Sequence, residues 1–238
     1  MIRTILVVLL VTLFLIFTTP FRFLLTKING DSTKTETLLL HMAQRIFQAV
    51  LFLSGTEVII KGKENIPDDT AVLFVSNHRG FFDIGVGYCQ VKGPCSFIAK
   101  KELEKIPLLS SYMDALHCLF LDRENPREGL KTILTAIDLA KNGHSIWVCP
   151  EGTRSKTKEM LPFHEGSLKI ASKANCPIIP VAITGTDDVL ENHFPFIRPT
   201  KVTIAFGKPI IANTLPRPEQ KALGNYTQNI IKNMLEEE

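Results

Sequence analysis

A histidine and an aspartate follow a hydrophobic run and are separated by only four residues. The stretch "AVLFVSNHRGFFDIG" (71–85) passes directly from apolar residues to His78 and then to Asp83. Positions five apart on a straight helix are about 140° from one another, so a direct contact needs a turn, which Gly80 makes feasible. A carboxylate bonded to one ring nitrogen fixes the tautomer, and the other nitrogen can then take a proton from a hydroxyl group. The alternative is a capping turn in which Asp83 merely favours a helix N-terminus.

A second polar turn, "PEGTRS" (150–155), follows another hydrophobic run. Gly152 favours a sharp exit from the preceding strand, as glycine does in tight turns. Arg154 carries a planar, permanently charged guanidinium that matches the geometry of phosphate oxygens. Glu151 could orient Arg154 or bond a substrate hydroxyl, which predicts an anion-binding turn. The alternative is a surface turn with an internal ion pair between Glu151 and Arg154.

A third polar pair closes the segment "FLDRE" (120–124), where Asp122 and Arg123 end a hydrophobic run. Arg123 could be a second anion-binding residue, and the alternative is a solvated strand end. Cys149 adjoins the 150–155 turn, which leaves a Cys–His nucleophile pair open. Motifs of several other enzyme classes are absent from the sequence, namely GxSxG, GxxxxGK[ST], GxGxxG and HExxH.

Short β-rich runs alternate with helical patterns from residue 57 onward. This alternation predicts an α/β domain with a mixed, largely parallel sheet flanked by helices. The runs "AVLFV" and "IIPVAI" lack polar alternation, as do central strands covered on both faces. The expected strands are 57–62, 71–76, 95–99, 117–122, 144–149, 177–183 and 201–207, and the expected helices are 81–91, 107–116, 127–141, 165–174 and 217–236.

The three polar turns all follow expected strands. In open α/β sheets, ligands bind beyond the carboxyl ends of the strands. Parallel neighbouring strands would therefore bring His78, Arg123 and Arg154 to one edge of the sheet. The order of the strands is not given by the sequence, so their convergence is an expectation.

The N-terminal part of the chain is strongly apolar. Residues 5–17 read "ILVVLLVTLFLIF", and the run approaches the roughly 20 residues that a spanning helix needs when Thr18 to Phe21 are included. No small-x-small cleavage site follows, which argues against a signal peptide. No polar face appears over four turns, which argues against a core helix. We expect a retained membrane anchor that either spans the bilayer or dips into one leaflet, with its orientation undecided.

A second N-terminal helix is expected over 35–53. Its apolar residues follow helical spacing, and Gln44, Arg45 and Gln48 supply a partly polar side. The helix could lie at the membrane interface beside the first one, or it could be a core helix of the following domain. The sequence therefore predicts helical membrane-anchoring segments in 1–54 and one α/β domain in 55–238.

The composition narrows the class of partner. The chain has 238 residues with a net charge of +3, too weak a basic excess to favour nucleic acid but compatible with an anionic membrane surface or a phosphate-bearing substrate. Its five cysteines are odd in number and form no CxxC pair, which argues against a disulfide framework or a zinc ribbon. We expect the catalytic part to lie in a reducing compartment, without a metal.

Four blocks in order resemble the glycerolipid acyltransferase family, and within it the bacterial-type 1-acyl-glycerol-3-phosphate acyltransferases. The blocks are "NHRGFFD" (77–83), "KKELEKIPLL…LFLDRE" (100–124), "PEGTRS" (150–155) and "CPIIPVAITG" (176–185). The first looks like the NHxxxxD motif of the family. The chain departs from a common family pattern at "FHEG" (163–166), where His164 stands in place of a frequent lysine.

The resemblance implies a membrane-associated transferase of phospholipid biosynthesis. Such an enzyme moves a fatty acyl group from acyl-CoA or acyl-carrier protein to the sn-2 hydroxyl of lysophosphatidic acid, which forms phosphatidic acid. His78 would be the general base and Asp83 its orienting partner, with no covalent acyl-enzyme and no cofactor. The active site would lie at the cytoplasmic face of the inner (plasma) membrane.

The resemblance also implies an acceptor site. Arg154 would grip the glycerol phosphate, and further residues would assist it. The implied substrate-binding residues are Lys100, Lys101, Arg123, Glu151, Gly152, Thr153 and Arg154. Three alternatives stay open: the same chemistry on glycerol 3-phosphate or another lysolipid, a thioesterase that uses water, and a non-catalytic protein that binds membrane lipids.

Overall fold

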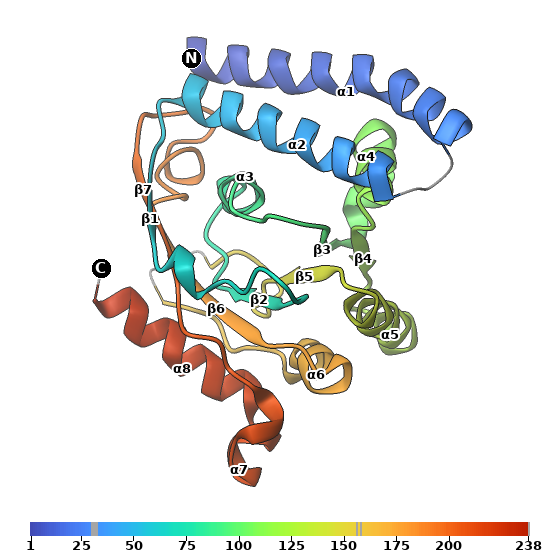
Figure 1. Cartoon of the computed structure of the whole chain (residues 1–238). Helices are drawn as coiled ribbons and strands as arrows, with labels where there is room; N and C mark the ends of the chain where they lie inside the picture. Colours follow the sequence, from blue (N-terminus) through green and yellow to red (C-terminus); the bar gives the residue numbers. More distant parts are fainter. Residues whose placement is uncertain (30–32, 156, 158, 238) are drawn as a thin grey trace.

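The fold places a seven-stranded sheet between two layers of helices (Figure 1). The computed structural model describes residues 1–29, 33–155, 157 and 159–237. The strands are β1 (Glu57–Lys61), β2 (Leu73–Ser76), β3 (Cys95–Lys100), β4 (Leu119–Leu121), β5 (Ser145–Val148), β6 (Ile178–Thr184) and β7 (Lys201–Phe206). The helices are α1 (Ile2–Asn29), α2 (Thr33–Ser54), α3 (Phe82–Tyr88), α4 (Pro107–Ala115), α5 (Pro126–Lys141), α6 (Glu165–Ala174), α7 (Arg217–Lys221) and α8 (Leu223–Glu236).

The strand order is β1-β7-β6-β2-β5-β3-β4. The five strands from β6 to β4 are parallel, whereas β7 runs antiparallel to β6 and pairs in parallel with the edge strand β1. This arrangement confirms the predicted α/β class with a mixed, largely parallel sheet. All seven predicted strands are present, and β2 and β6 occupy the middle of the sheet, as their continuous apolar sequences require.

The two faces of the sheet carry different kinds of packing. On one face, the ring of Trp147 stacks between Phe74 and Phe97, with centroid separations of 4.8 Å and 5.2 Å. On the other face, aliphatic residues such as Leu73 and Ile146 are fully buried under α5, α6 and α8. Alternate residues of β2 therefore belong to two separate cores, which fixes the direction in which the strand presents its last residues.

The predicted C-terminal helix over 217–236 is interrupted. It consists of α7 and α8, because Ala222 leaves the helical region with φ −115° and ψ 41°. The start of α8 is held from outside, since the Glu165 carboxylate accepts from the backbone N–H groups of Gly224 at 2.8 Å and Asn225 at 3.2 Å. A carboxylate at a helix N-terminus is favourable, and here it comes from α6.

The first helix is longer than its clean apolar run, because it continues through Pro20 to Asn29. Proline removes one backbone donor and normally kinks a helix. Next to it, the hydroxyl groups of Thr18 and Thr19 each donate to the carbonyl four residues earlier, at 2.6 Å. Their acceptors are the carbonyl groups of Phe14 and Leu15, whereas the carbonyl that loses its regular donor because of Pro20 is that of Ile16.

The two N-terminal helices lie side by side over α3 and α4 (Figure 1). Leu39, Leu40 and Ala43 of α2 are buried in the same cluster as Val86 of α3. By length and composition, both α1 and α2 could cross a membrane. Since α2 also packs on the sheet-containing part of the protein, the division of the chain at residue 54 stays a prediction.

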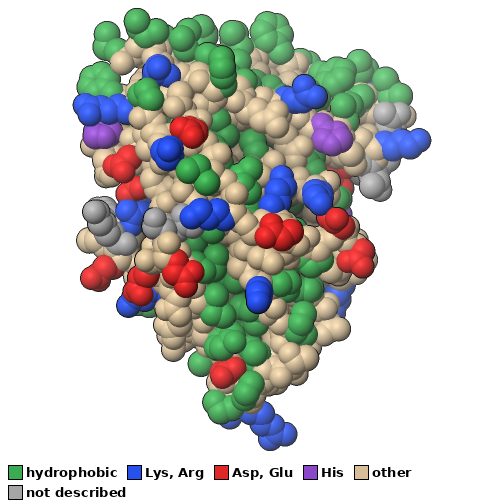
Figure 2. Space-filling view, turned by 60° about the vertical axis from the view of Figure 1, so that its left-hand side comes forward, with side chains coloured by type: hydrophobic (Ala, Val, Ile, Leu, Met, Phe, Trp, Pro, Cys, Tyr) green, Lys and Arg blue, Asp and Glu red, His purple; other side chains and the backbone are tan. Residues whose placement is uncertain are grey.

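The outer side of α1 presents a continuous apolar surface to the exterior. Figure 2 shows hydrophobic side chains gathered along the top of the molecule, where α1 and α2 lie. Phe17 and Phe23 are 69% and 70% exposed, and most other large apolar residues of α1 are also exposed. Exposed apolar patches of this extent mark interaction with another protein or a membrane.

Candidate active site

The predicted polar turns meet at the carboxyl edge of the sheet. The turn that contains His78 follows β2, and the 150–155 turn follows its parallel neighbour β5. Arg123 follows β4 on the same side of the sheet, and its Cζ lies 3.3 Å from the position that a Cβ at Gly152 would occupy. Gly152 has φ +76°, a conformation that favours glycine. The ends of β2, β5 and β4 therefore converge, as expected.

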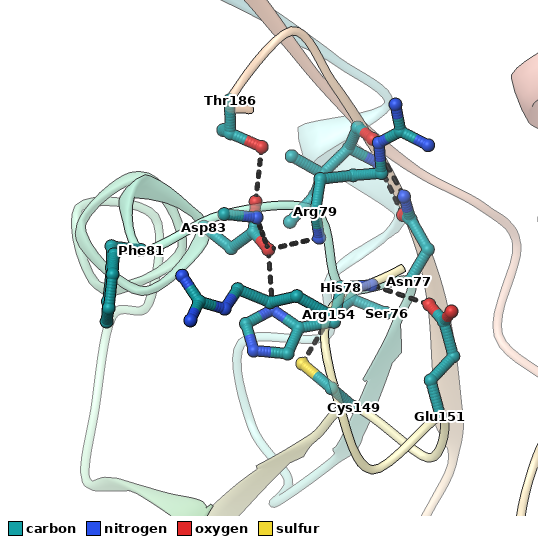
Figure 3. Close-up of polar contacts among 12 residues, drawn as sticks. Ser76, Asn77, His78, Arg79, Phe81, Asp83, Cys149, Glu151, Arg154 and Thr186 are labelled. Carbon is teal, nitrogen blue, oxygen red and sulfur yellow. Dashed lines mark hydrogen bonds and ion pairs between the residues drawn. The ribbon is translucent and has the colours of Figure 1, made fainter. Parts of the chain in front are cut away.

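The structure brings His78 and Asp83 into direct contact. His78 Nδ1 lies 2.7 Å from Asp83 Oδ2, and Figure 3 shows the imidazole directly below the carboxylate. The turn through Gly80 reverses the chain before α3 begins, so the two side chains face each other despite their five-residue spacing. Because an ionised carboxylate can only accept, the contact assigns the proton to Nδ1 and leaves Nε2 with a free lone pair.

The Asp83 carboxylate is buried and surrounded by donors. Besides His78, Oδ2 accepts from the backbone N–H groups of Arg79 at 2.7 Å and Gly80 at 2.9 Å. Its other oxygen, Oδ1, accepts from the hydroxyl of Thr186 at 2.5 Å. Asp83 therefore shapes the turn and orients the imidazole at the same time, so the helix-capping and catalytic interpretations are compatible. The imidazole itself keeps 20% of its surface exposed and can reach a ligand.

Asn77 fixes the place where the His78 turn leaves the sheet. Its side-chain amide donates to the carbonyl of Ile183 at 2.8 Å and accepts from the N–H of Ile183 at 2.8 Å. The side chain thus extends the hydrogen-bond ladder between β2 and β6 by one step after β2 has ended. Asn77 is only 1% exposed, so these bonds hold the turn in one position relative to β6.

The Glu151 carboxylate bonds two backbone N–H groups and not Arg154, which the sequence had suggested as its partner. Its Oε1 accepts from the backbone N–H of His78 and Oε2 from that of Leu161, both at 2.7 Å. Burial raises the pKa of the Glu151 carboxyl, although the two N–H donors oppose that shift. Glu151 is 4% exposed and joins the 150–155 turn to the His78 turn, which makes it a brace between two loops.

Arg154 is held by residues that no local motif indicated. Its Nη1 donates to Glu191 Oε1 at 2.8 Å, and its Cζ lies 4.0 Å from the centre of the Phe81 ring. Figure 3 shows the guanidinium beside the imidazole of His78, with Phe81 beyond it. An imidazole and a guanidinium therefore lie next to each other at the surface. Glu191 belongs to the loop after β6, as does Thr186.

The other predicted substrate-binding residues lie at the rim of the site. Lys100 and Lys101 are exposed at the end of β3, and Lys101 Nζ is 2.9 Å from Asp122 Oδ2. Thr153 is exposed in the turn between Gly152 and Arg154. A role for these residues in binding an acceptor stays a prediction. His164 is exposed at the start of α6, and its backbone N–H donates to Pro150.

The structure disfavours Cys149 as a nucleophile. Burial raises the pKa of its thiol to about 12, and Sγ lies 3.3 Å from Ser76 Oγ. The thiolate is the reactive form, so almost none is present near neutral pH. We expect Cys149→Ala to keep enzymatic activity within about threefold of the wild type, since the change removes one sulfur atom and no reacting group. Steady-state rates of both proteins measure this, and a loss above a hundredfold would restore the Cys–His alternative.

Comparison with known proteins agrees with this geometry. Residues 57–184 match the family described as Acyltransferase. A 1-acyl-sn-glycerol-3-phosphate acyltransferase of Saccharomyces cerevisiae is 28% identical over 82% of this chain, and one of Bacillus subtilis is 31% identical over 68% of this chain and 78% of its own length. The chain spans 44% to 66% of the length of several yeast and plant relatives that it matches.

A solved structure extends the similarity beyond the matched region. The crystal structure of the 1-acyl-sn-glycerophosphate (LPA) acyltransferase PlsC from Thermotoga maritima superimposes with a TM-score of 0.84 at 28% identity. The match covers 99% of this chain and 95% of the Thermotoga maritima chain, so it includes the two N-terminal helices. Since the family match also covers more than half of the sequence, the protein belongs to the acyltransferase family.

Proposed function

We propose that the protein transfers a fatty acyl group from a thioester donor to the sn-2 hydroxyl of lysophosphatidic acid. The observation that carries this proposal is the contact of His78 with Asp83 beside the guanidinium of Arg154. A lysophosphatidate has a hydroxyl group next to a phosphate, and the site has a base next to a cation. The relatives that are named for this activity support the same assignment.

The geometry supports a direct transfer without an acyl-enzyme. His78 Nε2 takes the proton of the acceptor hydroxyl, and the oxygen attacks the thioester carbonyl to form a tetrahedral intermediate. When the intermediate collapses, the carbon–sulfur bond breaks and the imidazolium returns its proton to the thiolate. Asp83 stabilises the imidazolium that exists between these steps. Backbone N–H groups near the 150–155 turn would stabilise the oxyanion.

An apolar cavity of about 410 Å³ opens near this site. Its walls come from α1, α2, α3 and the loop after β6, and they include Phe47, Phe82 and Leu190. Phe81 lines the cavity and also contacts Arg154. The carbonyl end of an acyl chain that lies in the cavity would therefore come close to the polar groups of the site. Lipid-binding sites are expected to combine such apolar walls with a few polar groups.

Membrane association is part of the proposal because the acceptor is a lipid. The exposed apolar side of α1 is suited to contact hydrocarbon, whether the helix spans the bilayer or lies in one leaflet. The start of α1 also contacts the loop after β6, since Thr4 Oγ1 donates to Pro195 O at 3.0 Å and accepts from Ile197 N at 2.9 Å. We place the active site at the cytoplasmic face of the inner membrane, where acyl-CoA or acyl-carrier protein can deliver the donor.

An acceptor-by-donor assay tests this function. Detergent-purified protein is mixed with lysophosphatidate and either acyl-CoA or acyl-carrier protein, and both free thiol and phosphatidate are measured. Equal amounts of the two products support the proposal. Release of thiol and fatty acid without any acceptor would indicate a thioesterase, and tight lipid binding without thiol release from any donor would indicate a non-catalytic protein. Glycerol 3-phosphate and other lysolipids as acceptors separate the remaining alternatives.

Replacement of Arg154 should weaken binding of the acceptor. We expect Arg154→Ala to raise the KM for lysophosphatidate by about tenfold to a hundredfold, because a hydrogen bond to a charged group contributes about 1.5–3 kcal/mol. Arg154→Lys should recover only part of this loss, since lysine lacks the planar pair of donors. The KM for the acyl donor should change little in either variant. An unchanged KM for lysophosphatidate in Arg154→Ala would contradict the assigned phosphate contact.

A further inference from the structure

The loop after β6 contributes a carboxylate to the anion-binding side of the site. Glu191 opens a short helical turn (Glu191–His193) in this loop. One oxygen, Oε1, accepts from Arg154 Nη1 at 2.8 Å and from the backbone N–H of Phe81 at 2.7 Å. Its side chain is 20% exposed, less than the 37% of Arg154, so the guanidinium is the more accessible of the two groups to a ligand.

The position of Arg154 is fixed on two sides. The Phe81 ring covers one face of the guanidinium, and Glu191 bonds one end of it. Among the described residues, Glu191 is the hydrogen-bond partner of the group and occupies one of its five N–H donors. A guanidinium held in this way can present a pair of parallel donors to a phosphate without first becoming ordered.

The same carboxylate connects the cation to the base. Phe81, whose N–H bonds Glu191, is in the turn that carries His78 and Asp83. The second oxygen of Glu191 would lie 2.7 Å from a Cβ at Gly80, so the carboxylate can seat against this turn because residue 80 has no side chain. Glu191 therefore contacts both the guanidinium and the turn that carries the imidazole.

The loop itself is tied to the His78 turn at two further points. Thr186 donates to Asp83, and Asp187 Oδ2 accepts from Arg79 Nη2 at 2.6 Å. These contacts hold the beginning of the loop, and the contact of Ile197 with Thr4 holds its end. Glu191 lies between these anchored ends, so its carboxylate has a defined place relative to the site.

We propose that Glu191 is a positioning residue that gives the enzyme its specificity for a phosphate-bearing lysolipid, an inference that rests on the function proposed above. It orients the Arg154 guanidinium so that an acceptor phosphate is bound with its neighbouring hydroxyl at His78. The acceptor class that fits is a lysolipid with a phosphomonoester next to the free hydroxyl. An uncharged monoacylglycerol would use His78 but would gain nothing from Glu191.

The test compares two acceptors in three variants. Kinetic constants are measured for lysophosphatidate and for monoacylglycerol of the same chain length with wild type, Glu191→Gln and Glu191→Ala. Glutamine keeps an acceptor for the Phe81 N–H but loses the charge that orients Arg154, so it preserves the loop. Asp188→Asn is the matched control, because it removes the same charge from the same loop, where Asp188 bonds Asn192 and not Arg154.

We expect Glu191→Gln to raise the KM for lysophosphatidate about tenfold, the size of one charge-assisted hydrogen bond, with kcat and the rate on monoacylglycerol nearly unchanged. Glu191→Ala should have a larger effect in the same direction, and Asp188→Asn should behave like the wild type. The ratio of kcat/KM for the two acceptors should therefore fall only in the Glu191 variants.

Two results would overturn the inference while the proposed function stands. Equal losses on both acceptors would show that Glu191 only supports the loop, and a lower KM for lysophosphatidate would show that Glu191 competes with the phosphate. If the wild type itself uses both acceptors equally well or uses neither, the proposed function fails and the role of Glu191 fails with it. Thermal unfolding of each variant confirms that the comparison is made between folded proteins.

Discussion

Substitution of His78 by alanine should reduce kcat about 10³- to 10⁴-fold, toward the upper end of what general base catalysis contributes. Within the described part of the chain, the imidazole is the one group in contact with Asp83 that can accept a proton from the acceptor hydroxyl. The other donors to that carboxylate there are two backbone N–H groups and a threonine hydroxyl. Binding of the lipid should persist, because the apolar cavity and Arg154 do not depend on the imidazole. The measurement is thiol release under saturating lysophosphatidate and acyl-CoA.

His164→Ala is the matched control for this prediction. His164 follows the "PEGTRS" turn in the sequence, but its side chain is exposed at the start of α6. Its backbone N–H contacts that turn by donating to the carbonyl of Pro150, and the substitution by alanine keeps this bond. The control variant should keep nearly full activity. If His78→Ala also kept more than about a tenth of the wild-type rate, the assignment of the base would be wrong, because such a loss is below what a positioned base supplies.

The elements of the fold could be predicted because their signals are local. Strand β2 is apolar throughout because both of its faces are buried. Helices α5 and α6 have apolar residues at helical spacing because each buries one face, and both patterns can be read from the local sequence alone. The rule that ligands bind beyond the carboxyl ends of parallel strands then led to the expectation that His78 and Arg154 lie at one edge of the sheet. The order of the strands needed the structure, since it depends on contacts between distant segments.

The partners of the site residues could not be predicted in the same way. Glu151 is three residues from Arg154, and the sequence left open whether it orients Arg154, bonds a substrate hydroxyl or forms a surface ion pair with Arg154. The structure instead pairs Arg154 with Glu191, 37 residues away, and turns Glu151 inward to two backbone N–H groups. Glu191 and Thr186 are in a loop without a repeating pattern, and their place depends on how that loop folds against the His78 turn.

The bounds of the helices near the two termini also differ from those that the sequence predicted. The clean apolar run predicted for the first helix ends at Phe17, but α1 continues through Pro20 to Asn29. The break between α7 and α8 depends on Glu165, which caps α8 from another helix. The contact at α8 joins residues that are 59 positions apart, and a single sequence does not show which such bonds form.

Substitution of Asp83 by asparagine should lower kcat about a hundredfold while the protein stays folded. The amide oxygen of asparagine can replace Oδ2 as the acceptor for His78 and the two backbone N–H groups, and its NH₂ can donate to Thr186. The tautomer of His78 is therefore kept, and what is lost is the negative charge that stabilises the imidazolium. A hydrogen bond to a charged group contributes about 1.5–3 kcal/mol, and each 1.4 kcal/mol is tenfold in rate.

Asp83→Ala separates the two roles of this carboxylate. Alanine leaves the backbone N–H groups of Arg79 and Gly80 without their acceptor in a buried place, which should cost about 1–3 kcal/mol of unfolding free energy for each group left unpaired. This variant should therefore unfold at a distinctly lower temperature than both the wild type and Asp83→Asn, and it should be the less active of the two. If Asp83→Asn instead kept kcat within about threefold of the wild type, the charge would be unnecessary and Asp83 would serve only to shape the turn, because the expected loss is near a hundredfold.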